Sequence, residues 1–82
     1  MELVVDVFPV ARDRWIAVVG APLGEFSTEA VTPDRIPDEV ASAIFGVLGS
    51  SHSWLLVDEL GLPWSPDSAP TQLLRMLGLD SP

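Results

Sequence analysis

The sequence contains no cysteine, no lysine and only one histidine, His52. Without cysteine the chain cannot form a disulfide or offer a thiolate ligand to a metal ion. A lone histidine in a polar loop lacks the further ligands of a zinc site, and it lacks the positioned nucleophile and acid that a catalytic base needs. The sequence therefore predicts no metal site, no cofactor and no catalytic residue, and we expect a protein that is not an enzyme.

Basic residues are also scarce. Four arginines face twelve acidic residues, which gives a net charge of −8. Proteins that bind nucleic acid usually carry a basic stripe that replaces the counterions of the phosphates, and four scattered arginines do not form one. The acidic balance favours solubility or attraction to a basic protein partner, and it argues against a nucleic-acid partner.

Long apolar runs are absent as well. No run approaches the roughly 20 residues that a membrane-spanning helix requires, so we expect no membrane partner. The first residues carry Glu2 and Asp6 and no basic residue, unlike a secretion signal, so we expect a cytoplasmic protein. Eighty-two residues suit one domain. We place a single α+β domain at 1–78 and a frayed C-terminal tail at 79–82.

What the chain does contain is a high share of apolar residues, 48%. Stretches rich in β-branched and aromatic residues predict strands at 2–10, 15–20 and 26–31, and a fourth strand at 54–59. The short connection "ARDR" predicts that the first two strands pair as an antiparallel hairpin.

Two prolines four residues apart, Pro33 and Pro37, stand before a helical pattern. A proline inside a helix costs about 3 kcal/mol, so we expect one turn at 33–35 and a fresh helix start at Pro37. This helix should run to about Leu48 and end at Gly49. Within it, Gly46 costs about 1 kcal/mol relative to alanine and is expected to allow a close approach of another element. The residues expected on its buried face are Ile36, Val40, Ile44, Val47 and Leu48.

A short last helix is predicted at 70–77, capped by Asp67 or Ser68 and ended by Gly78. The resulting order is β-β-β-α-β-α. This order predicts an α+β fold, with a mostly antiparallel sheet of three to four strands, one main helix on one face and a short C-terminal helix.

The first strand is apolar on both faces, and so is the strand at 54–59. One main helix covers only one face of a sheet, and each large side chain left in water forfeits about 1.5–3 kcal/mol. Exposed apolar patches commonly mark interfaces, so we expect a homodimer or a complex with another protein. The alternative is that the C-terminal segment, through Leu62 and Trp64, folds back and completes the core.

Trp15 and Trp54 begin strands and are expected in the core, whereas Trp64 lies in a proline-rich loop and is expected to contact a partner. The predicted partner-binding residues are Trp64, Leu62, Asp58, Glu59 and Trp54.

Two carboxylates, Asp6 and Asp58, could share one face of the sheet if their strands are adjacent. A close pair could hold a hard cation or share a proton. Alternatively they are rim charges that prevent pairing between sheet edges, which is the interpretation we favour.

Residues 3–48 resemble the HicB-like antitoxin domain. The resemblance lies in "RWIAVVG", "APLGEF" and "STEAVTPDRIPDEVASAI", which match that family's second strand, loop, polar strand and acidic helix start. It implies a β-β-β-α-β sheet that dimerises and that binds and blocks a small basic RNA-cleaving toxin. Two features depart from the family: Pro37 interrupts the helix start, and no basic DNA-binding segment follows position 60, so DNA binding is not implied.

Taken together, these patterns predict a non-catalytic acidic module, antitoxin-like or inhibitor-like, that masks a basic protein partner and acts as a dimer. The alternative is a structural or self-assembly accessory protein, for example one encoded by a phage, that uses an open sheet face.

Overall fold

The computed structural model describes residues 2–21, 24–50 and 52–78, so the predicted tail at 79–82 lies outside the described residues. The element order confirms the predicted α+β fold. The elements are β1 (Leu3–Ala11), β2 (Arg14–Ala21), β3 (Gly24–Ala30), the 3₁₀ turn η1 (Pro33–Arg35), α1 (Ile36–Leu48), β4 (Trp54–Val57), the 3₁₀ turn η2 (Pro66–Ser68) and α2 (Ala69–Met76).

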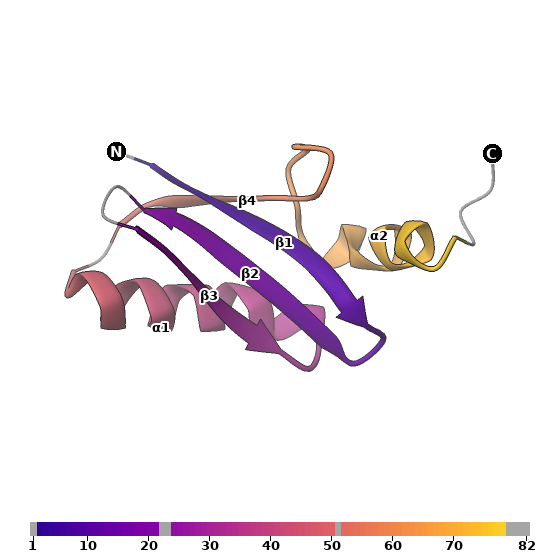
Figure 1. Ribbon diagram of the computed structural model, residues 1–82, viewed down its shortest axis with the longest axis horizontal. Helices are drawn as coiled ribbons and strands as arrows, with labels where there is room; N and C mark the ends of the chain where they lie inside the picture. Colours follow the sequence, from indigo (N-terminus) through magenta and orange to yellow (C-terminus); the bar gives the residue numbers. More distant parts are fainter. Residues whose placement is uncertain (1, 22–23, 51, 79–82) are drawn as a thin grey trace.

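The sheet has the strand order β3-β2-β1-β4 (Figure 1). β1 and β2 pair antiparallel, as do β2 and β3, which confirms the predicted hairpin. After β3 the chain crosses through α1 and returns as β4, which pairs parallel to β1. β3 and β4 are therefore the edges of the sheet, and β1 and β2 are its interior strands.

The turn at 33–35 forms as predicted, but it runs without a break into α1, which begins at Ile36 and not at Pro37. Pro33 begins the single turn of η1, and Pro37 lies in the first turn of α1. Amides in the first turn of a helix have no intrahelical acceptor, so the amide that Pro37 lacks costs nothing there. The helix ends at Gly49, whose backbone is left-handed (φ +71°) and whose N–H donates to the carbonyl of Phe45 at 2.8 Å.

Both helices contribute to one core layer. α1 packs on β2 and β3, whereas α2 lies beside the end of β1 (Figure 1). Alternate strand residues point into this layer, because successive side chains of a strand face opposite sides. The buried residues of this core are Leu3, Val5, Val7, Trp15, Ala17, Val19, Ile36, Val40, Ile44, Trp64 and Ala69.

Two sequence predictions about the buried elements were wrong. Val47 was expected to be buried but is 59% exposed, because the buried side of α1 follows Ile36, Val40 and Ile44 at four-residue spacing and continues to Leu48. The predicted strand at 54–59 ends at Val57, because Asp58 begins a turn.

Ser68 precedes the first residue of α2, but no side chain caps this helix, contrary to the prediction of a cap by Asp67 or Ser68. The Ser68 hydroxyl accepts the Ser65 N–H at 3.0 Å and donates to the Ser65 carbonyl at 2.9 Å. These bonds fix the η2 turn, from which α2 continues. None of the described helices is long and apolar enough to cross a membrane.

Candidate protein-binding surface

The face of the sheet opposite the helices keeps large apolar side chains in contact with solvent. Val4 is 50% exposed, and Val10 and Leu55 are each 41% exposed. Phe8, Ile16 and Val18 are half-buried on the same side, because they alternate with the core residues of β1 and β2. We call this surface the open face, defined by Val4, Asp6, Phe8, Val10, Ile16, Val18 and Leu55.

Asp6 lies in the middle of the open face. It is exposed, it belongs to an interior strand, and its cross-strand neighbours are Val18 on β2 and Val57 on β4. Residues paired in this way have Cβ atoms about 4.5–5.5 Å apart on one face. The Asp6 carboxylate is therefore surrounded by apolar side chains, and it is not at the rim as the sequence suggested.

The outer strand β3 adds two more acids to the same side of the sheet. Glu25 pairs across from Gly20, and Glu29 pairs across from Ile16. Arg14, the only basic residue in the four described strands, forms a 2.6 Å ion pair with Glu29. The hydrogen bond from Arg14 lowers the pKa of the Glu29 carboxyl, so both groups remain charged and paired. The side of the sheet that carries the open face therefore has a net negative charge.

The loop that follows β4 is organised by Asp58. Its Oδ1 atom accepts the backbone N–H groups of Leu60 and Leu62, at 2.9 and 3.0 Å. Gly61, with φ +79°, supplies the left-handed residue that the turn requires. Asp58 itself is buried, whereas Leu60 and Leu62 are 62% and 55% exposed. Leu62 is therefore exposed, its contact with a partner stays a prediction, and Asp58 is too buried to belong to a contact surface.

Glu59 and Arg75 form a charged cluster next to this loop. Glu59 accepts hydrogen bonds from Gln72 at 2.6 Å and from Arg75 at 3.0 Å, and Arg75 also lies 3.3 Å from the Asp58 carboxylate. Partial burial raises the pKa of Glu59. Hydrogen bonds from the backbone, from Gln72 and from Arg75, together with the charge of Arg75, outweigh burial, so the net effect is a lowered pKa. Glu59 is exposed, but Arg75 already neutralises much of its charge.

The structure places Trp64 in the core, so we withdraw it from the predicted contact surface. Trp64 is 5% exposed and its ring lies 6.1 Å from the ring of Trp15, at a tilt of 55°. Its backbone N–H donates to the Leu56 carbonyl at 2.8 Å, which draws the proline-rich segment alongside β4. The C-terminal segment thus folds back and completes the core, while Val4, Val10 and Leu55 of the open face stay exposed.

Gln72 is the residue that sequence reasoning missed. It is 1% exposed, accepts the Trp64 indole N–H at 2.7 Å, and donates to the Val7 carbonyl at 2.6 Å. The available signal was its position, because Gln72 occurs at helical spacing with buried Ala69 on the inner side of α2. A polar residue on that side indicates a buried hydrogen-bond network.

Trp54 lies at the opposite end of β4 from the Asp58 loop, half-buried against the core. Beside it, His52 makes a 3.1 Å contact between its Nδ1 atom and the Ser50 carbonyl, as an ordinary loop histidine does. Among the described residues, no group of three or more His, Cys, Asp or Glu side chains could hold a metal ion. Asp6 and Asp58 do not form a pair, because the Asp58 carboxylate faces its own loop and Arg75.

Comparison of the chain with protein-family models, with curated proteins and with solved structures found no significant match.

Proposed function

We propose that this chain is a non-catalytic, cytoplasmic protein-binding module that uses its open face to bind and mask a basic protein partner, and that it acts as a dimer. The proposal rests on one observation, which is the exposed Asp6 carboxylate at the centre of an exposed apolar surface. The resemblance of residues 3–48 to HicB-like antitoxins suggests the class of partner, a small basic toxin.

The chemistry of the open face selects its occupant. A partner that covers Val4 and Leu55 removes apolar surface from water, which is favourable by about 25 cal/mol per Å². The same partner also covers Asp6, and burying a carboxylate without a counter-charge costs several kcal/mol. An arginine or lysine at the matching position of the partner offsets this cost, so the face discriminates in favour of a basic protein.

Self-assembly through the open face, the alternative proposal, is disfavoured by the same residue. Two open faces that meet would enclose two Asp6 carboxylates in one apolar interface. Arg14 is the only basic residue in the four described strands, and it is already paired with Glu29. The described strands of a second copy therefore offer Asp6 no basic residue that is not already in an ion pair.

The test is a pair of charge-matched variants. Asp6→Lys and Asp34→Lys each change the net charge by the same amount, and both acids are exposed, but Asp34 lies in η1, away from the open face. Each variant is immobilised and compared with wild type for retention of a basic protein, starting with the product of the adjacent gene. We expect Asp6→Lys to abolish retention and Asp34→Lys to preserve it, with binding that weakens as salt rises. Equal retention by the two variants contradicts the proposal.

A further inference from the structure

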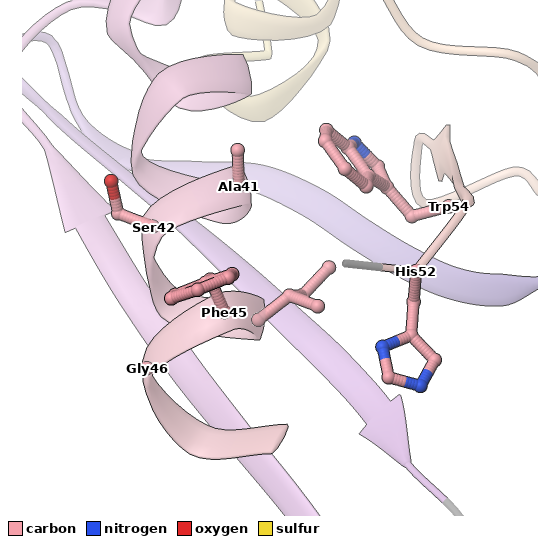
Figure 2. Close-up of a pocket in the computed structure, with 7 residues that line it drawn as sticks. Ala41, Ser42, Phe45, Gly46, His52 and Trp54 are labelled. Carbon is pink, nitrogen blue, oxygen red and sulfur yellow. The ribbon is translucent and has the colours of Figure 1, made fainter. Parts of the chain in front are cut away.

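The helix side of the sheet is not covered evenly. Strands lie about 4.8 Å apart and a helix with its side chains is about 10–12 Å wide, so one helix covers about two strands. α1 covers β2 and β3, and the eight-residue α2 packs mainly beside β1. Beside the start of β4 a hollow of about 590 Å³ remains between α1 and the segment that carries His52 and Trp54 (Figure 2).

The walls of this hollow are mainly apolar. Figure 2 shows Ala41, Phe45 and Gly46 on α1, with His52 and Trp54 across from them. Phe45 is 59% exposed, although it is the largest side chain on the outer side of α1. The surface therefore combines a projecting aromatic ring and a space that could receive one.

The same surface lacks charge, which is unusual for this chain. Residues 40–57 contain no aspartate, glutamate or arginine, although the whole chain has a net charge of −8. The nearest acids on α1 are Glu39 and Asp38, seven and eight residues before Gly46 and so roughly 10–12 Å away along the helix axis. A basic partner finds no counter-charge here. A second copy of the chain, which meets repelling acids on the open face, meets none at this hollow.

Gly46 has no packing role within the described chain. A Cβ atom at Gly46 would meet nothing within 4 Å, so the close approach expected from the sequence does not occur inside the monomer. A glycine inside a helix nevertheless costs about 1 kcal/mol relative to alanine. The missing side chain lowers the wall of the hollow on the solvent side, where another helix could approach.

We infer that this hollow is one half of a two-fold interface between two copies of this chain. The two α1 helices lie side by side, and Phe45 of each copy enters the hollow beside Gly46 of the other. In a two-fold interface the same patch of each copy contacts the other, so the patch must be complementary to itself. The projecting Phe45 ring and the hollow beside it meet this requirement. The inference names the surface for the proposed dimer, but it requires no basic partner and leaves the open face free.

The test measures the mass of the full chain in solution across a range of concentrations, by sedimentation or light scattering. We expect wild type at twice the 8.8 kDa chain mass. Phe45→Glu should raise the dimer dissociation constant at least about tenfold, a change of about 1.4 kcal/mol. The matched control is Leu74→Glu, which places the same charge at an exposed leucine of α2 outside the hollow and should leave the dimer intact.

Gly46→Leu separates loss of the interface from loss of the fold. Leucine is a better helix former than glycine and finds open space at this position, so the helical circular dichroism should be kept while the dimer dissociates. A monomeric wild type overturns the inference, as does equal dissociation by Phe45→Glu and Leu74→Glu. A dimer that survives Phe45→Glu but is lost in Val4→Glu would place the interface on the open face instead. The retention experiment with Asp6→Lys tests the binding of a basic protein by the open face, and its result does not depend on any of these outcomes.

Discussion

Trp15 and Trp64 are both buried indoles in contact with each other, but only one of them has a hydrogen-bond partner. The Trp64 N–H donates to Gln72 at 2.7 Å, whereas the buried Trp15 N–H has no hydrogen-bond partner among the described residues. Replacing each tryptophan by phenylalanine removes a similar ring volume from the same core. We predict that Trp64→Phe destabilises the protein more than Trp15→Phe does.

The size of the difference follows from what each substitution does to a buried polar group. Trp64→Phe leaves the Gln72 carbonyl oxygen buried without its donor, at a cost of about 1–3 kcal/mol, whereas Trp15→Phe removes a donor that is already unpaired. The free energy of unfolding should therefore differ between the two variants by about 2 kcal/mol or more. The total free energy of unfolding of a domain of this size is about 4–12 kcal/mol, so this difference is a large part of it. At about 4–8 °C per kcal/mol, Trp64→Phe should melt about 8–16 °C below Trp15→Phe.

The assay is urea unfolding followed by far-ultraviolet circular dichroism, because the substitutions change the tryptophan fluorescence. All variants are measured at one chain concentration, since association shifts apparent stability. The control is a double-mutant cycle with Gln72→Leu. Removing both partners of the bond should cost at least about 1 kcal/mol less than the sum of the two single changes. Equal costs for the two phenylalanine variants, or an additive cycle, would refute the assigned role of the Trp64–Gln72 bond.

Two further predictions concern the charged cluster after β4. Because the folded state lowers the pKa of Glu59 below its ordinary value of 4.5, its ionised form stabilises the protein above that pH, and the contribution is lost as the pH falls through the lowered pKa. The melting temperature of Glu59→Gln should thus fall less than that of wild type over this acidic window, and parallel curves would count against the argument. Asp58→Ala removes the acceptor of two loop amides, so hydrogen exchange at Leu60 and Leu62 should accelerate at least about tenfold. Asp58→Asn keeps an oxygen at that position and should accelerate the exchange less. Unchanged exchange in Asp58→Ala would show that the loop does not depend on this side chain.

Local chemistry explains why much of the fold could be predicted from the sequence. The proline pair places a 3₁₀ turn before the α-helix, because the ring of proline is tolerated in the first turn of a helix and not in its interior. The two-sided apolar character of the first strand predicted that one face would lack a cover, and the open face bears this out for the described residues.

The candidate site was predicted less well, because burial depends on residues far apart in the chain. A tryptophan between prolines looks like a surface residue until the 62–64 segment pairs with β4 and brings its indole to Gln72 and Trp15. Asp58 looks like a free charge until its loop closes around it. Asp6 looks like a rim residue until the strand order makes β1 an interior strand.

The sequence by itself determined the class of fold, the element order and the acidic, cysteine-free character of the surface, because these follow from residue types and short-range spacing. Only the tertiary structure decided that β4 returns beside β1 and that both helices bury side chains in one core. Strand order is set by long-range pairing, which no local pattern encodes. That pairing is what leaves Asp6 exposed among valines and leaves the hollow beside Phe45 open.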